Sequence, residues 1–437
     1  MKNPADYSGW QEEYVGSTRL SRRDLLAQAG SLAALGRIAV PAEAGTTQTA
    51  GELPRGVTPF RIDIPKARID WIMAQLRDVE WPDAPEDADP WAYGTSLPVM
   101  KDLVQYWRTK YDWRARQARM NQLPQFKARV EGYDIHFVHV RGSGPNPRPI
   151  VISHGWPNTF LEFAKVVEPL AHPERHGGLV EDAFSVVVPS LPGYAFSSKP
   201  SRPIGAPTTA RLWDALMSNV LGYRDYIAQG GDLGFTISRE IGYQAANCRA
   251  IHLNHLLGIG GPSLTPEEKE AEATRANWTQ VEGAYMAIQR TKPLTLAYAM
   301  SNSPVGVAAW ILEKVRAWSG LAGGDPWSLY SRDEVLDNIM LFIVTNTFGT
   351  ASWYYAASRT EAAAPARGKL EKPTGFAEYP AHVSSVGMWP RSYAERHYNV
   401  VWWSRPPAGG HFPADEVPGL FVDDLRGFNR QLRSLGV

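Results

Sequence analysis

The residue best placed to do chemistry is Asp232, at the centre of the run Gly230-Gly231-Asp232-Leu233-Gly234. An apolar strand is expected before it, up to residue 230, and a helix after it, over 236–248. Glycines permit a sharp turn in which the backbone packs closely on both sides and the central side chain stays exposed at a helix N-terminus. A carboxylate in that position can attack carbon. The alternative is an aspartate that only caps the helix, the commoner role of a single Asp in such a turn.

His411 is the second candidate, in the run Ala408-Gly409-Gly410-His411-Phe412 that follows the last expected strand, over 398–404. A histidine on a glycine-rich loop that faces the Asp232 turn can take a proton from water and direct the hydroxide at a nearby ester. Alone, His411 would be interpreted as a turn residue. Together with Asp232 it predicts a nucleophile and a base, in that chain order.

The run His154-Gly155-Trp156-Pro157 ends an earlier strand, over 149–153, and predicts a place where backbone amides hold a developing oxyanion. We assign this role to the amides of Trp156 and Leu233. A tight turn shaped by Gly and Pro is the structural alternative, and it is compatible with the role because the donors are backbone groups. We expect His154 itself to support the loop.

The elements that must position these residues alternate between strand and helix. Continuous apolar runs at 149–153 and 184–188 are typical of strands buried on both faces of a parallel sheet. Helices are expected from about Phe160, over 208–221 and over 422–435, and further strands over 251–257 and 375–379. This order predicts an α/β fold with a doubly wound, mostly parallel sheet, whose sites lie at the carboxyl ends of the strands.

Two stretches interrupt that alternation. Residues 59–125 contain helices over 67–76 and 97–111, followed by a hairpin over 126–141 that turns at Gly132-Tyr133-Asp134. Residues 266–367 are long, helical and aromatic, and they predict a lid inserted over the site. The expected segments are therefore 59–145 at the N-terminal side, 146–262 as the first part of the core, 263–367 as the lid and 368–437 as the second part of the core.

Composition excludes several classes of partner. The 437 residues contain 45 Lys+Arg and 45 Asp+Glu, so the charge balance indicates neither nucleic acid nor an anionic membrane surface. No stretch reaches the ~20 apolar residues of a membrane span. Cys248 is the one cysteine, which precludes an intrachain disulfide. The 16 Trp and 18 Tyr favour a site walled with aromatic rings.

The N-terminal residues predict a cellular location. Arg22-Arg23 precede a mildly apolar run over 27–40 and then Ala42-Glu43-Ala44, which resembles a twin-arginine export signal over 1–44 with an A-x-A cleavage site. A linker follows over 45–58. The expected location is periplasmic or extracellular. The alternative is an amphipathic helix and linker on a cytoplasmic protein, and Arg37 within the apolar run favours that alternative.

The chain resembles the microsomal-type epoxide hydrolases of the α/β-hydrolase superfamily from Pro59 to its C-terminus. The matching motifs are residues 60–82, His154-Gly155-Trp156-Pro157, Gly230-Gly231-Asp232, Ser303-Pro304-Val305-Gly306, Trp310-Ile311-Leu312-Glu313-Lys314, Pro373-Thr374-Gly375 and Gly409-Gly410-His411-Phe412.

The resemblance implies that Asp232 attacks an epoxide carbon to give an alkyl-enzyme ester, which water activated by His411 hydrolyses to a diol. It also implies that two lid tyrosines, Tyr285 and Tyr355, donate to the epoxide oxygen, with Tyr354 as the alternative to its neighbour. The implied substrate is an apolar or aromatic epoxide, and no metal and no organic cofactor is implied.

The chain departs from the family pattern at the partner of the catalytic histidine. The family places a carboxylate there, and the matching position holds His382. Glu378 is the nearest carboxylate by sequence and is the candidate orienting acid, although strand alternation leaves the direction of its side chain open. Leu233 is a second departure, because many relatives carry Trp there.

Three other functions stay open from the sequence. A haloalkane dehalogenase shares the Asp nucleophile but needs N–H donors around halide, and Leu233 removes one indole that could serve. An esterase would ordinarily place Ser or Cys at the turn. A secreted binding protein on the hydrolase scaffold, with impaired turnover, is favoured only by His382.

Overall fold

The computed structural model describes residues 53–437 except 88, 257–260, 322–323 and 362–366. The expected signal over 1–44 and most of the expected linker lie outside the described residues, so export stays a prediction. None of the described helices is long and apolar enough to cross a bilayer.

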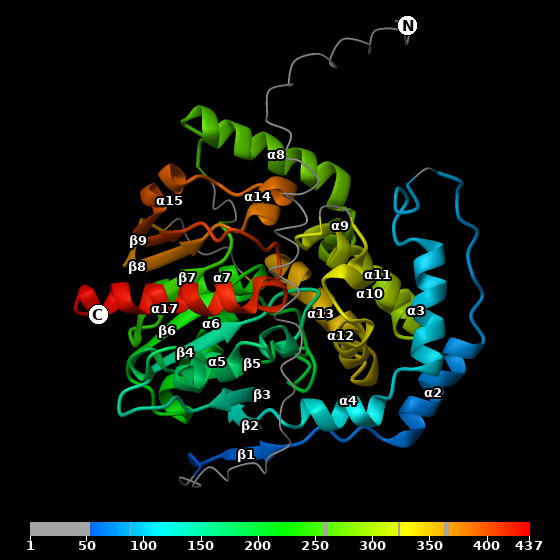
Figure 1. Ribbon diagram of the computed structural model, residues 1–437, viewed down its shortest axis with the longest axis horizontal. Coiled ribbons are helices and arrows are strands. Elements are labelled where there is room, and N and C mark those ends of the chain that lie inside the picture. Colours follow the sequence, from blue (N-terminus) through cyan, green and yellow to red (C-terminus); the bar gives the residue numbers. More distant parts are fainter. Residues whose placement is uncertain (1–52, 88, 257–260, 322–323, 362–366) are drawn as a thin grey trace, which may run out of the picture. The chain divides into compact units, whose positions relative to one another are not determined.

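One mixed sheet forms the centre of the described residues, in the order β1-β2-β3-β5-β4-β6-β7-β8-β9 (Figure 1). The pairs from β5 through β4 to β9 are parallel, and the pairs from β1 to β5 through β3 are antiparallel. The strands are β1 Val57–Phe60, β2 Gln125–Val130, β3 Tyr133–Val140, β4 Arg148–Ser153, β5 Phe184–Pro189, β6 Tyr226–Gly230, β7 Cys248–Leu253, β8 Leu370–Ala377 and β9 Tyr398–Ser404.

The direction of winding reverses beside β4. The chain moves from β4 to β5 in one direction along the sheet, and then crosses back over β4 to reach β6 and β7. Because such crossovers are right-handed, the intervening helices α5 (Val167–Ala171) and α6 (Ala206–Ala215) lie on opposite faces of the sheet. The carboxyl ends of β4 and β6 therefore meet at a switch point, where ligands bind in this class of fold.

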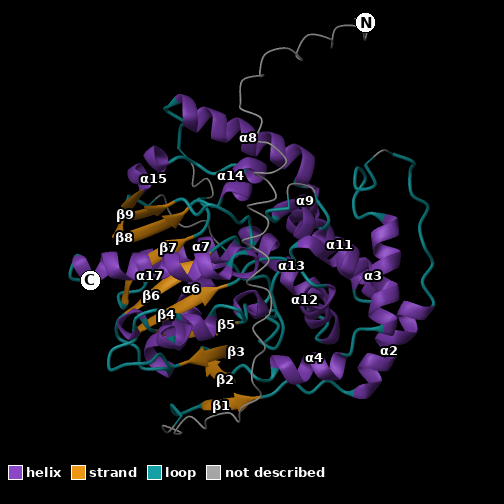
Figure 2. Cartoon of the chain, in the orientation of Figure 1, coloured by secondary structure: helices purple, strands orange, loops and turns teal. Residues whose placement is uncertain are grey.

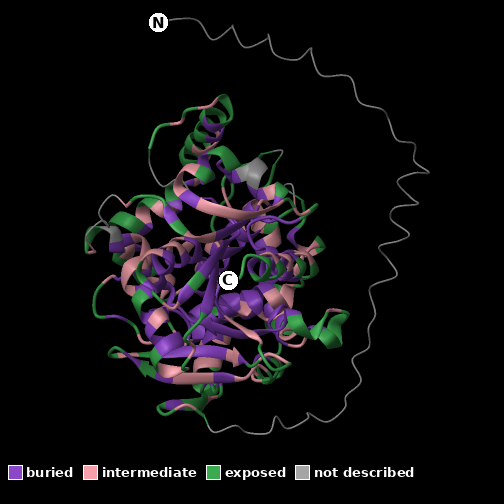
Figure 3. Ribbon diagram, turned by 90° about the vertical axis from the view of Figure 1, so that its left-hand side faces the viewer, coloured by how far each residue is buried: buried purple, intermediate pink, exposed green. Residues whose placement is uncertain are grey.

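The sheet and the helices that cover it form a continuous core (Figure 3). Ile150, Val151 and Ile152 of β4 are fully buried, as are the three valines of β5, which is why each strand contains an uninterrupted apolar run. Helix α7 (Leu233–Gln244) packs against β6 and β7, and α17 (Pro418–Ser434) packs against β8 and β9. The expected α/β fold with a mostly parallel sheet is confirmed.

Helices occupy the rest of the molecule beside the sheet (Figures 1 and 2). Helix α11 contacts α2 and α3, so the helices between β7 and β8 pack on those that precede β2. These helices are α2 Lys66–Arg77, α3 Leu97–Thr109, α4 Trp113–Met120, α8 Pro266–Glu282, α9 Ala284–Thr291, α10 Pro293–Met300, α11 Pro304–Trp318, α12 Arg332–Val344 and α13 Phe348–Ala356. Three short α-helices follow β8 and β9, namely α14 Pro380–Val386, α15 Arg391–His397 and α16 Pro413–Glu416.

Several boundaries differ from the sequence-based expectation, and two of these differences place a further histidine at the site. Helix α7 ends at Gln244 instead of 248, because Cys248 pairs with Tyr226 as the first residue of β7. Strand β7 then ends at Leu253 instead of 257. Sheet pairing overrides the local helical pattern here, and it places His255 in the loop at the carboxyl edge of the sheet.

Candidate active site

The Asp232 turn has the sharp strand-to-helix geometry that the sequence predicts. Asp232 has φ 50° and ψ −120°, a strained backbone conformation at the N-cap of α7, and its side chain makes no capping hydrogen bond. A Cβ on Gly230 would lie 2.2 Å from the Gly234 carbonyl oxygen, and a Cβ on Gly234 would lie 2.1 Å from that of Ser153. The two glycines are therefore required for the close approach of β4, β6 and α7. The helix-cap alternative is wrong for this aspartate.

The Asp232 carboxylate is held from two sides. The Trp156 amide donates to Asp232 Oδ1 at 2.9 Å, and Asp232 Oδ2 lies 3.5 Å from Nε2 of His411. A Cβ on Gly155 would lie 2.5 Å from Asp232 Oδ1, so the loop after β4 can approach this closely only with glycine. The side chain is 19 % exposed. The structure thus brings together Asp232, His411 and the amide of Trp156, while the Leu233 amide is the first of α7.

His411 is fixed by the loop that carries it. Its amide donates to the Trp318 carbonyl at 2.9 Å, and its ring packs on the Trp318 indole at a centroid distance of 4.9 Å. A Cβ on Gly410 would lie 2.7 Å from the same carbonyl oxygen. The C-terminal end of α11 therefore determines where this imidazole stands. Trp318 was not among the residues expected from the sequence, and only the general abundance of Trp pointed to it.

The partner of His411 is a histidine. The Nδ1 atoms of His411 and His382 lie 3.2 Å apart, a hydrogen-bond distance. Glu378 lies elsewhere, because its carboxylate accepts from the Trp403 indole at 3.0 Å and pairs with Arg405 at 2.7 Å. The expectation that Glu378 orients His411 is therefore wrong. Its amide continues the β8 to β9 ladder by donating to Ser404, which turns the side chain away from the site.

A third histidine completes the group. The Asp232 amide donates to Nδ1 of His255 at 2.9 Å, and the His255 ring stacks on His382 and His411 at 3.9 and 4.5 Å. Burial, and then the neighbouring imidazoles and Arg275, hold the pKa values of His255 and His382 well below the ordinary value, so both rings are neutral. His255 was missed because the sequence placed it within a strand.

The three imidazoles are the described group that could hold a metal, with donor nitrogens within 4.8 Å of one another. The rings of His382 and His411 lie at 24° and 20° to that of His255 and at 41° to one another. The Nδ1 atoms of His382 and His411 face each other at 3.2 Å and Nδ1 of His255 accepts the Asp232 amide, so these nitrogens are engaged with protein groups, whereas a metal needs ligands that converge on it. This arrangement does not fit a metal centre.

Aromatic rings cluster near the Asp232 carboxylate, whose charge acts on two tyrosines among them. Trp156 stacks on Tyr285 at 4.9 Å and meets Tyr355 edge-on at 6.0 Å, and the two tyrosine rings lie 5.8 Å apart. Burial, and then the charge of Asp232 for Tyr285, raises the pKa of each tyrosine above its usual value, so both hydroxyls stay protonated. Tyr354 instead interacts with Thr209 and Thr236 on the core side. Of the two neighbours, Tyr355 faces the site.

A small hollow that contains Asp232 and His411 is also lined by Glu162, which no sequence motif singled out. Burial, with the nearby Asp415 and Asp232, raises the pKa of Glu162 well above its usual value, and Asn158 hydrogen-bonds to it. Burial therefore favours the protonated, neutral form of a carboxyl group that lines the same hollow as Asp232. The sequence pattern did not indicate that Glu162 lies at the site, because it predicts a longer helix where the chain forms a short 3₁₀ turn, Phe160–Phe163.

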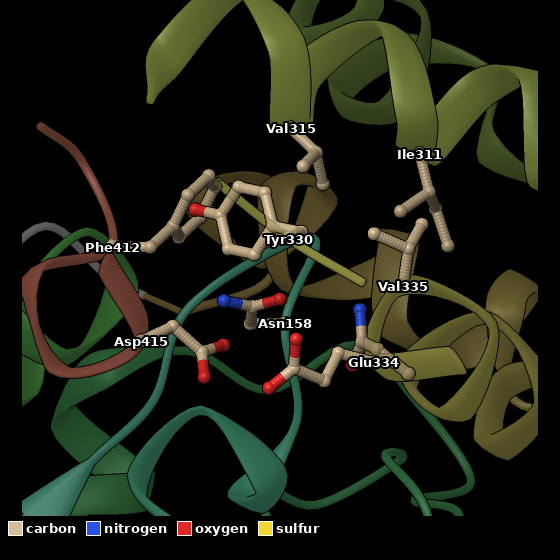
Figure 4. Close-up of a pocket in the computed structure, with 9 residues that line it drawn as sticks. Asn158, Ile311, Val315, Tyr330, Glu334, Val335, Phe412 and Asp415 are labelled. Carbon is tan, nitrogen blue, oxygen red and sulfur yellow. The ribbon is translucent and has the colours of Figure 1, made fainter. Parts of the chain in front are cut away.

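A second hollow lies behind Phe412, which lines both (Figure 4). It contains about 330 Å³ of space unfilled by atoms, including the part open to solvent. In Figure 4, Ile311 and Val315 extend from α11 on one side, and the carboxylates of Asp415 and Glu334 lie on the other, near Asn158. Lys165 lies 2.9 Å from Glu334 and 3.5 Å from Asp415.

Known proteins match almost all of the described residues. The family description "Epoxide hydrolase N terminus" matches residues 57–163, and "alpha/beta hydrolase fold" matches 148–280. A Stigmatella aurantiaca protein named provisionally as an epoxide hydrolase is 38 % identical, covering 87 % of this chain and 86 % of its own. Epoxide hydrolase 1 of Oryctolagus cuniculus is 32 % identical, covering 84 % and 88 %.

A solved structure agrees with these relatives. Aspergillus niger epoxide hydrolase is 29 % identical, with a TM-score of 0.74, and covers 87 % of this chain and 98 % of its own. Sequence and fold thus agree over both the segment that precedes the core and the core itself. The chain belongs to the microsomal-type epoxide hydrolases of the α/β-hydrolase superfamily.

Proposed function

We propose that this epoxide hydrolase opens apolar or aromatic epoxides through an ester on Asp232. The observation that carries the proposal is the carboxylate geometry: Oδ1 accepts from the Trp156 amide, and Oδ2 lies 3.5 Å from His411 Nε2. Oδ2 is then the attacking oxygen, and Oδ1 becomes the ester carbonyl oxygen. Water attack turns Oδ1 into the oxyanion, which the Trp156 amide already contacts and which the Leu233 amide joins.

The proton balance closes within the named residues. Oδ2 forms a bond to an epoxide carbon, the ring C–O bond breaks, and Tyr285 or Tyr355 donates a proton to the ring oxygen. Water then adds to the ester carbonyl while His411 takes one of its protons. The substrate oxygen leaves with that proton, and the second water proton returns from the Asp232 carboxyl to the tyrosinate. The sum is epoxide plus water to diol.

The aromatic wall supports the substrate class. Tyr285, Tyr355, Trp156 and Trp318 lie in mutual ring contact around the nucleophile, and such rings favour an apolar or aromatic substituent. The helices α9, α11 and α13 carry three of these side chains, so the proposed lid both covers the site and supplies its proton donors. Family membership favours this reaction over dehalogenation or ester cleavage.

The test is isotope transfer to the enzyme. With styrene oxide as a probe in ¹⁸O-labelled water, repeated turnovers should place ¹⁸O in the peptide that contains Asp232, because hydrolysis occurs at the ester carbonyl. Asp232→Ala should form no diol, while the surface variant Asp63→Ala should turn over normally. Diol formation by Asp232→Ala, or ¹⁸O in the diol alone during a single turnover, would exclude the mechanism.

A further inference from the structure

His382 and His411 form a buried pair that the family pattern does not provide. Both side chains are buried, at 1 % and 7 % exposure, and their Nδ1 atoms lie 3.2 Å apart. His411 must present an Nε2 lone pair to water, because Nε2 is the atom that faces Asp232. Its hydrogen is then on Nδ1, and His382 Nδ1 must be the acceptor.

To accept from His411, His382 must be neutral with its own hydrogen on Nε2. His255 already accepts the Asp232 amide through Nδ1, so its own hydrogen stands on Nε2. Burial, and then His411 and Arg275, hold the pKa of His382 well below the ordinary value, which keeps its ring neutral and its Nδ1 lone pair available. The stacked His255 ring restricts the rotation of both partners.

We propose that neutral His382 is the positioning residue of His411, and that it replaces the orienting carboxylate of the family. This inference rests on the proposed function, because His411 acts only in ester hydrolysis. A neutral acceptor fixes the tautomer of His411 but balances the charge of the imidazolium less well than a carboxylate does. Ring opening by Asp232 does not need the pair, so the alkyl-enzyme ester should accumulate during turnover.

The experiment separates the two steps on the full chain with styrene oxide as the probe. Rapid quenching and intact mass measurement give the rate at which the ester forms and the rate at which it disappears. His382→Leu should slow ester disappearance roughly 10- to 100-fold, the effect of losing one hydrogen bond to a charged group, and change ester formation less than about threefold.

Two further variants test the acceptor itself. His382→Asn places an oxygen near the position of Nδ1, and His382→Gln places its acceptor near that of Nε2. His382→Asn should therefore hydrolyse the ester at a rate within about threefold of that of the parent chain. His382→Gln should hydrolyse it as slowly as His382→Leu does. This comparison decides the question even if His382→Leu does not fold. Equal rates for Asn and Gln would overturn the proposal.

A carboxylate at the same position should change the pH dependence. His382→Glu should shift the rise of the hydrolysis rate to higher pH, because an anion stabilises the protonated form of His411. Three other charged groups act on the three histidines: Asp232 at the start of α7, Arg275 on α8 and Glu416 on α16. These groups are the same in every variant.

Glu378→Gln is the matched control on the neighbouring segment. Its carboxylate contacts Trp403 and Arg405, so both rates should equal those of the parent chain. An unchanged pH profile in His382→Glu, or a loss in Glu378→Gln equal to that of His382→Leu, would contradict the proposal. Absence of accumulated ester in the parent chain would also contradict it. Absence of ¹⁸O from the Asp232 peptide after repeated turnovers of the parent chain would instead reject the nucleophilic role of Asp232, which separates the two failures.

Discussion

At the scale of single residues, two neighbouring tyrosines should differ in function although the sequence does not separate them. Tyr355 packs against Trp156 and Tyr285 near Asp232, whereas Tyr354 interacts with Thr209 and Thr236. Tyr355→Phe removes the proposed donor to the developing alkoxide and should therefore slow ester formation by about 10²-fold. Tyr354→Phe, the matched control, should leave that rate within about threefold. Quenched-flow measurement of the alkyl-enzyme gives both rates, and equal effects would mean that the donor is misassigned.

At the scale of elements, the Asp232 turn depends on how closely β4, β6 and α7 approach one another. A Cβ on Gly234 would lie 2.1 Å from a backbone oxygen of β4, which no side-chain movement can relieve. Gly234→Ala should therefore lower the free energy of unfolding by about 3 kcal/mol and abolish diol formation.

The matched control is Gly419 of α17, where a Cβ would meet no neighbouring atom within 4 Å. Gly419→Ala should therefore raise the free energy of unfolding by about 0.5 kcal/mol. Urea unfolding measures both changes, and a Gly234→Ala protein of parent stability would refute the packing argument.

At the scale of the whole molecule, the hollow of Figure 4 should make stability depend on pH. Burial raises the pKa of Asp415 from 3.8 to about 7, and Lys165, the cation that pairs with it among the described residues, is shared with Glu334. When folding raises the pKa of a carboxyl group, the protein becomes less stable as the pH rises from the pKa of the unfolded state to that of the folded state. For Asp415 this range runs from about 4 to about 7. The shift corresponds to about 4 kcal/mol for a fully buried group. The side chain is 23 % exposed, so we expect the free energy of unfolding to fall by on the order of 2 kcal/mol over this range.

Urea unfolding at pH 4 and pH 8 measures this fall. Asp415→Asn should lack it, and the exposed Asp63→Asn should retain it. Parallel pH profiles for the parent and Asp415→Asn would contradict the assignment.

The residues whose roles the sequence did not predict, or predicted wrongly, share one property: their positions depend on contacts between distant segments. His255 reaches the site because β7 ends at Leu253, and Trp318 because the end of α11 meets the His411 loop. Glu162 lies beside Asp232 through a short 3₁₀ turn. Glu378 was preferred over His382 because a carboxylate is the usual partner, but pairing between β8 and β9 directs it to Arg405. No local pattern encodes these four outcomes.

The sequence by itself determined the fold class, the strands that are buried on both faces and the sharp turn that carries Asp232. These features follow from local rules, since apolar runs require burial and a strained turn requires glycine. Only the tertiary structure decided which imidazole nitrogens face one another, which of two adjacent tyrosines lies at the site and where the Glu378 carboxylate binds. A side chain's direction is set by the packing of elements far apart in the chain, and a displacement of one residue in strand register would reverse it.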